Sequence, residues 1–137
     1  MGSGEATIPR AWFTRSLMPM LLADLERRYV DANAAACLLL RAPRQELLRL
    51  RVDDLTVPRA LPGLDSRWRD FVAAGTQAGT NTLVTPDGQE LFVAYSATMY
   101  ANDLAHIAMW HGRIQAVLAT LDREELRWAG RRDGRRS

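Results

Sequence analysis

The sequence has little cysteine, no lysine and no long apolar run. Its one cysteine, Cys37, excludes an internal disulfide and is typical of a reducing compartment, so we expect a cytoplasmic protein. No apolar stretch approaches the roughly 20 residues of a membrane-spanning helix, so we expect no membrane partner. All 18 basic residues are arginine, which is typical of a GC-rich genome, and the net charge of +2 is too small to indicate nucleic-acid binding.

Patterns of catalytic or metal-binding residues are also missing. His106 and His111 lie five positions apart on a predicted strand and would point to opposite faces, so they cannot share one metal. We expect both histidines at the surface or at an interface. The acidic pair Asp53–Asp54 consists of chain neighbours, which do not face one target on a helix, and we expect it to cap a short helix. No catalytic triad or phosphate-binding glycine loop occurs, so the sequence predicts a non-catalytic protein.

What the chain does contain is enough for one α+β domain. With 137 residues, 47% hydrophobic and 25% charged, it can build its own core. We divide it into an N-terminal segment with a short helix (residues 1–14), a main domain (15–112), a C-terminal helix (113–129) and an arginine-rich disordered tail (130–137).

Periodicity and turn residues predict the elements of the main domain. Asn33 is a good N-cap for a helix over residues 34–40, and Asp87-Gly88 is a strong hairpin signal between two strands. Side chains of residues 91–100 alternate, with Val93 and Tyr95 on one face and Phe92 on the other. The remaining expected elements are two short strands on either side of residues 24–28, helices over residues 9–17, 44–48 and 66–74 (the last capped by Asp65 or Ser66 and ended by Gly75), and strands over residues 80–85, 89–100 and 104–111.

The order of these motifs resembles a PAS domain, a sensory and interaction fold. Asp24, Tyr29 and Ala32-Asn33 are in step with the family pattern Asp-x-x-Gly-x-Ile-x-x-Ala-Asn, although Arg27 stands where the family prefers glycine. Further along, residues 46–48, 52–55 and the Pro86-Asp87-Gly88 turn echo later family motifs. The resemblance implies a five-stranded antiparallel sheet with short helices on one face and flanking N- and C-terminal helices.

The resemblance also implies a small-molecule pocket between the sheet and the helices. Haem-binding relatives take a histidine from the helix over residues 66–74, which here has none, and flavin-binding photosensors use a cysteine motif that this chain lacks. We therefore expect neither cofactor, and an unknown small apolar ligand is the remaining option. The pocket candidates are Leu21, Ala36, Leu39, Phe71, Asn81, Leu83, Val93, Tyr95, Ile107 and Met109.

Several apolar surfaces favour a homodimer. One domain of this size cannot easily cover an N-terminal aromatic pair, the second face of the long strand and a C-terminal helical stripe. The interface candidates are Trp12, Phe13, Phe92, Trp110, Ile114 and Leu118. Because no output domain fits in the chain, we expect either that a signalling protein acts as a partner in trans or that the chain is a fragment of a longer protein.

Two other functions compete with this interpretation. A cone-shaped α+β enzyme of the steroid-isomerase and polyketide-cyclase type has similar length, but it needs an inward acid or histidine, and the predicted strands are nearly free of acids. A regulator that contacts nucleic acid through its arginine tail would rest on the tail alone, so we expect no nucleic-acid partner.

Overall fold

The computed structural model describes residues 10–111. Residues 1–9 and 112–137 lie outside this description, so the predicted C-terminal helix, the tail and the interface candidates Ile114 and Leu118 stay predictions. No helix within residues 10–111 is long and apolar enough to cross a membrane.

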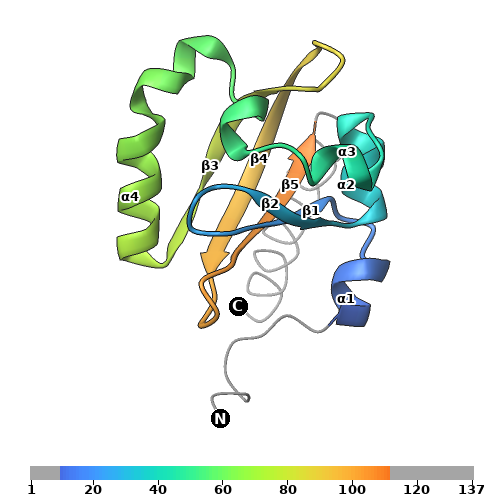
Figure 1. The fold of residues 1–137 in the computed structure, drawn as a ribbon, viewed down its shortest axis with the longest axis horizontal. Helices are drawn as coiled ribbons and strands as arrows, with labels where there is room; N and C mark the ends of the chain where they lie inside the picture. Colours follow the sequence, from blue (N-terminus) through green and yellow to red (C-terminus); the bar gives the residue numbers. More distant parts are fainter. Residues whose placement is uncertain (1–9, 112–137) are drawn as a thin grey trace, which may run out of the picture.

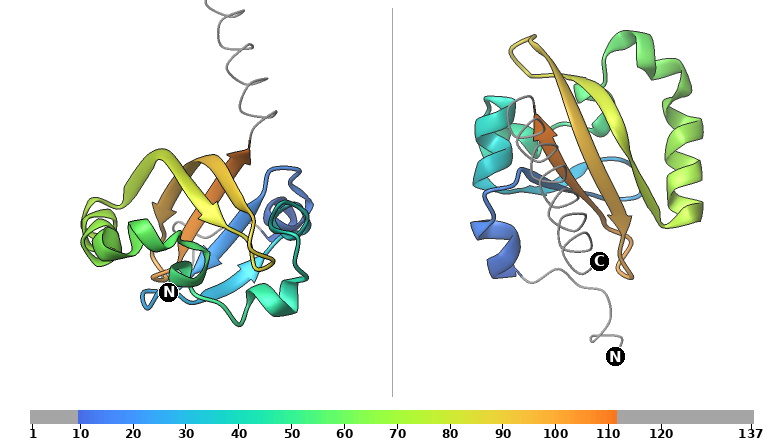
Figure 2. Two further views of the ribbon diagram at one scale, coloured as in Figure 1. Left: turned by 90° about the horizontal axis from the view of Figure 1, so that it is seen from above. Right: turned by 180° about the vertical axis from the view of Figure 1, so that it is seen from behind.

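One five-stranded antiparallel sheet, in the order β2-β1-β5-β4-β3, organises the domain. Figure 1 shows α4 beside β3 at one end of the sheet and α2 with α3 at the other, and Figure 2 shows the same arrangement from above and from behind. The strands are β1 (Met20–Ala23), β2 (Tyr29–Ala32), β3 (Thr76–Val84), β4 (Glu90–Met99) and β5 (Ala105–His111). The helices are α1 (Arg10–Arg15), α2 (Ala34–Leu40), α3 (Arg44–Leu47) and α4 (Leu64–Ala74), with 3-10 helices η1 (Val52–Leu55) and η2 (Pro58–Gly63).

The main core lies between α2, α3, η1 and α4 and one face of the sheet, the inner face. Alternation along β4 buries Val93 and Ala97 on this face and leaves Phe92 half exposed on the opposite, outer face. The inner face thus carries the core, and the predicted fold class and strand alternation are confirmed.

Helix α1 covers part of the outer face. Phe13 packs there against Met20 of β1 and Ala108 of β5, and only 3% of its surface is exposed. The prediction that Phe13 lies in an exposed dimer surface is therefore wrong, because its own sheet covers it.

His106 is also buried on the outer face, contrary to the expectation of a surface or interface residue. Its ring lies 5.3 Å from the ring of Trp12 and 6.2 Å from that of Tyr100, measured between centroids. Its Nε2 atom has no hydrogen-bond partner among the described residues, and burial lowers the pKa of the imidazole. The side chain is therefore held neutral, as part of the packing under α1.

Two element boundaries differ from the predicted ones for identifiable reasons. Strand β3 begins at Thr76 rather than residue 80, because its backbone pairs with β4 from Thr76 onward despite the weak strand propensity of Gly79. Helix α4 begins at Leu64 with Gly63 as its N-cap and no side-chain capping bond, so the capping predicted for Asp65 or Ser66 is wrong. The predicted end at Gly75 is confirmed by its left-handed backbone (φ 85°).

Arg27 explains why glycine is preferred in the β1–β2 turn. Its φ of 66° lies in the left-handed region, which costs a residue other than glycine about 1–2 kcal/mol. The side chain compensates, because its guanidinium donates two hydrogen bonds to Asp53 at 2.9 and 3.0 Å and forms an ion pair with Asp65 at 2.8 Å. The hydrogen bonds from Arg27 hold the pKa of the Asp53 carboxyl below its usual value. The turn, η1 and α4 are thereby joined at one side chain.

Two substitutions at Arg27 separate the backbone strain from the ion pairs. Arg27→Ala keeps the strain and loses the ion pairs, so it should lower the free energy of unfolding by about 1.5–3 kcal/mol. Arg27→Gly loses the same ion pairs but relieves the strain. This variant should therefore lower the free energy of unfolding by about 1 kcal/mol less than Arg27→Ala does. Urea unfolding of both variants measures the difference. Equal stability of the two variants would show that the turn carries no strain.

Candidate functional site: the inner cavity

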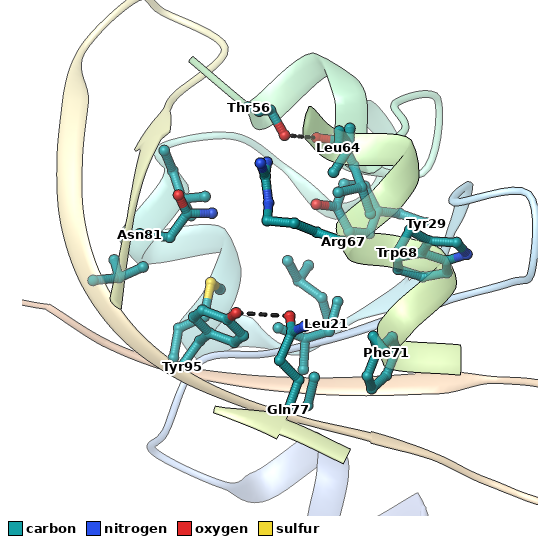
Figure 3. A pocket seen from close by; sticks show the side chains of 16 residues that line it. Leu21, Tyr29, Thr56, Leu64, Arg67, Trp68, Phe71, Gln77, Asn81 and Tyr95 are labelled. Atoms are coloured by element: carbon teal, nitrogen blue, oxygen red, sulfur yellow. Dashed lines mark hydrogen bonds between the residues drawn. The ribbon is translucent and has the colours of Figure 1, made fainter. Parts of the chain in front are cut away.

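A cavity lies between the inner face of the sheet and α4, with η1 and the start of β2 at its side (Figure 3). We call it the inner cavity, and its volume is about 100 Å³. The residues that line it are Leu21, Tyr29, Val52, Thr56, Leu64, Arg67, Trp68, Phe71, Gln77, Asn81, Leu83, Val93, Tyr95, Ala97, Ile107 and Met109.

Eight of the ten predicted pocket residues line this cavity; Ala36 and Leu39 do not. Ala36 is fully buried in the core on α2, and Leu39 is a half-buried residue packed against the same core. Both belong to α2, which lies away from the cavity because α4 and η1 form its wall. The prediction of these two residues as pocket lining is therefore wrong.

Half of the lining residues were not predicted. Ala97 could have been found, since it shares the period-two face of Val93 and Tyr95. Arg67 and Trp68 could not have been predicted from the sequence. Polar or amphipathic residues on a short helix do not indicate which side of the helix faces a cavity. Tyr29 was singled out only as part of the family pattern, and its hydroxyl reaches the cavity from β2 (Figure 3).

The lining is mostly apolar, with a few polar groups from several elements. The Tyr95 hydroxyl donates a hydrogen bond to Oε1 of Gln77 at 2.7 Å, so these two groups satisfy each other. The Asn81 amide and the Tyr29 hydroxyl form no hydrogen bond to the residues drawn in Figure 3. Burial raises the pKa of the Tyr29 hydroxyl, which therefore stays protonated and remains a donor. A few polar groups beside an apolar space are what a small ligand needs for orientation.

Helix α4 closes the cavity and is held by two polar contacts to the β1–β2 turn. The indole Nε1 of Trp68 donates to the carbonyl of Leu25 at 3.2 Å, and Asp65 pairs with Arg27. Phe71 anchors the same helix in the core and stacks edge-on against Trp68. The wall of the cavity is thus a helix attached at its first two turns.

The size and the lining of the cavity limit which cofactors it can hold. No group of three or more metal-ligating side chains occurs in the part of the chain that the structure describes. Cys37, the residue that a flavin adduct would require, lies half-buried on α2 outside the cavity lining, and burial raises the pKa of its thiol. A space of about 100 Å³ also falls below the roughly 300–1,000 Å³ of a site for a drug-sized ligand or cofactor.

A second candidate surface lies on the outer face and at the edge of α1. We define the outer surface by Trp12, Phe92 and Trp110, of which the first two are 48% and 54% exposed. Trp110 is half-buried, and its Nε1 atom has no hydrogen-bond partner among residues 10–111. Large exposed aromatic side chains such as Trp12 and Phe92 are typical of contact surfaces.

Comparison with solved structures identifies the fold. A domain of a sensory box sensor histidine kinase/response regulator from Geobacter sulfurreducens is 26% identical, with a TM-score of 0.63 over 72% of this chain and 88% of that one. A PAS domain from Colwellia psychrerythraea is 16% identical, with a TM-score of 0.68 over 75% and 92% of the two chains. A PAS domain of a LuxR-family transcriptional regulator from Burkholderia thailandensis, in complex with ethanol, is 13% identical, with a TM-score of 0.65 over 77% and 97%.

No protein-family model matches the sequence, and no curated protein matches it either. A PAS domain from a two-component sensor histidine kinase is also similar, with 14% identity and a TM-score of 0.65 over 74% of this chain and 91% of that one. The described residues therefore have the fold of a PAS domain, the fold of sensory and interaction modules, as the sequence pattern predicts.

Proposed function

We propose that the protein is a sensory module that binds a small, mainly apolar molecule in the inner cavity. The observation that carries the proposal is the cavity itself, an apolar space with the polar groups of Tyr29 and Asn81 in its lining. Its volume is of the order of an engineered protein cavity of about 150 Å³ that binds benzene. The ethanol complex of the Burkholderia PAS domain concerns a ligand of the same small class.

Occupancy of the cavity would act on the helix that closes it. A ligand that contacts Trp68 and Phe71 favours one position of α4 over others, in proportion to its difference in affinity for them. The Arg27–Asp65 pair links α4 to the β1–β2 turn, so a shift of the helix reaches the rest of the sheet. We propose that a separate signalling protein reads this change.

We also propose that two copies of the chain pair through the outer surface. Trp12 and Phe92 expose apolar area that one subunit leaves in water, and burial contributes about 25 cal/mol per Å². A symmetric pair would bring these residues together near a twofold axis. A cavity on one face and a dimer contact on the other would let ligand binding alter subunit contacts through a single sheet.

Filling the cavity tests the ligand proposal. Ala97→Leu adds three carbons on the inner face of β4, so it should abolish stabilisation of the protein by benzene, a probe that fits a cavity of this size. In the wild type, benzene at about a hundred times its Kd should raise the free energy of unfolding by about 2.7 kcal/mol. Thermal unfolding with and without benzene measures both.

The matched control is Ala94→Leu, the same change on the outer face of the same strand, which should leave benzene binding intact. Loss of binding in the Ala94 variant alone, or equal stabilisation of the wild type and the Ala97 variant, would show that the ligand lies elsewhere. No stabilisation of the wild type by benzene, 1-hexanol or indole would contradict the proposal itself.

A further inference from the structure

Arg67 places a positive charge at the cavity without a matching negative charge. The residue belongs to the exposed side of α4, yet its side chain lines the cavity and points toward the β3 side, where Asn81 lies (Figure 3). One of its guanidinium nitrogens, Nη2, donates to the carbonyl of Ala60 at 2.9 Å. No carboxylate of residues 10–111 pairs with it, whereas the nearby Arg27 and Arg59 each have an acidic partner.

Gly63 makes room for this position of the guanidinium. A Cβ atom on residue 63 would lie 2.7 Å from Nη1 of Arg67, which is closer than real Cβ contacts allow. Nη1 is the end of a flexible side chain, so a Cβ atom on residue 63 would displace the guanidinium at little cost. A substitution at residue 63 can therefore move the charge without removing the arginine.

The charge acts on the interior of the cavity. Burial raises the pKa of the Tyr95 hydroxyl, and the charge of Arg67 opposes this rise, so its field reaches the floor of the cavity. The Asn81 amide offers a donor on the same side. The other end of the cavity is apolar, with Leu21 and Met109 in its lining.

We propose that the ligand of the inner cavity is a small aliphatic or aromatic monocarboxylate, held at its carboxylate by Arg67 and Asn81. Its apolar part, of up to about six carbons on the scale of the benzene-binding cavity, lies against Leu21 and Met109. A guanidinium is the side chain best suited to a carboxylate, because it donates two parallel hydrogen bonds to it. This inference rests on the proposed function and adds the chemical class of the ligand.

Calorimetry with hexanoate and 1-hexanol tests the class, because the two probes share a chain and differ in charge. The wild type should bind hexanoate about tenfold to a hundredfold more tightly than hexanol, as a charge-assisted hydrogen bond predicts. Arg67→Gln should remove this preference and leave hexanol binding unchanged. Gly63→Ala should weaken hexanoate binding in the same direction, since it displaces the guanidinium. Arg69→Gln is the matched control, an exposed arginine of the same helix outside the cavity lining, and should change neither affinity.

Each outcome separates the inference from the proposed function. Equal binding of hexanol and hexanoate, or hexanoate binding that Arg67→Gln leaves unchanged, would overturn the carboxylate inference and leave an apolar sensor in place. A loss of hexanoate affinity in Arg69→Gln as large as in Arg67→Gln would attribute the effect to net charge and also overturn it. Absence of binding for both probes and for benzene would contradict the proposed function as well.

Discussion

Replacing Asn33 by alanine is expected to destabilise the domain by about 3 kcal/mol or more, since it leaves several buried polar groups without partners. The side chain is 3% exposed and uses its full hydrogen-bonding capacity. Its Oδ1 atom accepts from the backbone nitrogens of Met20 at 3.0 Å and Ala36 at 2.9 Å. Its Nδ2 atom donates to the carbonyls of Phe13 at 3.0 Å and Met18 at 2.9 Å. One residue thereby holds α1, the segment before β1, β1 itself and the first turn of α2.

Asn33→Asp is the conservative control for this network. An aspartate keeps the acceptor that caps α2 but cannot donate to the carbonyls of Phe13 and Met18, and it adds a buried charge. We expect it to destabilise the domain as well, in contrast to its neutral effect at an ordinary exposed cap. Urea unfolding gives both values. A loss of less than about 1 kcal/mol for Asn33→Ala, the usual value for a cap alone, would show that the network is not cooperative.

Phe92→Glu is expected to weaken the proposed dimer at least about tenfold while leaving the subunit folded. The side chain is 54% exposed on the outer face, so glutamate fits the isolated subunit without burial of its charge. In the dimer the same carboxylate would be desolvated without a partner. Sedimentation at increasing protein concentration gives the dissociation constant.

Leu38→Glu is the matched control, because Leu38 is 81% exposed on α2, away from the outer surface. We expect it to leave the association unchanged. If the wild type remains monomeric at high micromolar concentration, or if the Leu38 and Phe92 variants dissociate equally, the outer surface is not the contact.

The sequence is a good guide to this fold where local chemistry and tertiary structure agree. The alternation along β4, the Asn33 cap and the Asp87-Gly88 turn were predictable because each depends on a side chain and its nearest backbone. Gly88 shows the reason most clearly, since its φ of 93° requires a residue without a Cβ atom.

Tertiary contacts override local signals elsewhere. Asp65 reads as a helix cap, but it pairs with Arg27 and leaves the cap to Gly63. Of the expected acidic pair, only Asp54 caps η1, where its carboxylate accepts a hydrogen bond from the backbone nitrogen of Arg51. Asp53 instead accepts a hydrogen bond from Arg27. Periodicity cannot predict the contacts of Asp53 and Asp65, because their partner Arg27 lies 26 or more positions away in the sequence.

Most cavity residues on the strands could be predicted from the sequence, whereas most of those on the helices could not. The strand residues of the cavity were found because alternate positions of one strand share a face, and the pairing of β4 with β5 brings Tyr95 beside Met109. The helical residues Arg67 and Trp68 were missed, and Ala36 was wrongly included, since the side of a short helix that meets a cavity depends on how the helix is placed. Arginine is usually a solvent-facing residue, so only the structure shows that Arg67 lines the cavity.

The most direct test of the central claim, that the inner cavity is a ligand site, uses the methyl resonances of two methionines. Met109 lines the cavity, whereas Met20 packs under Phe13 on the opposite face of the sheet. In methyl-labelled protein titrated with benzene, and separately with hexanoate, the Met109 resonance should shift in a saturable way while that of Met20 stays in place. A saturable shift at Met20 with none at Met109, or no shift of either resonance with either probe, would contradict the account.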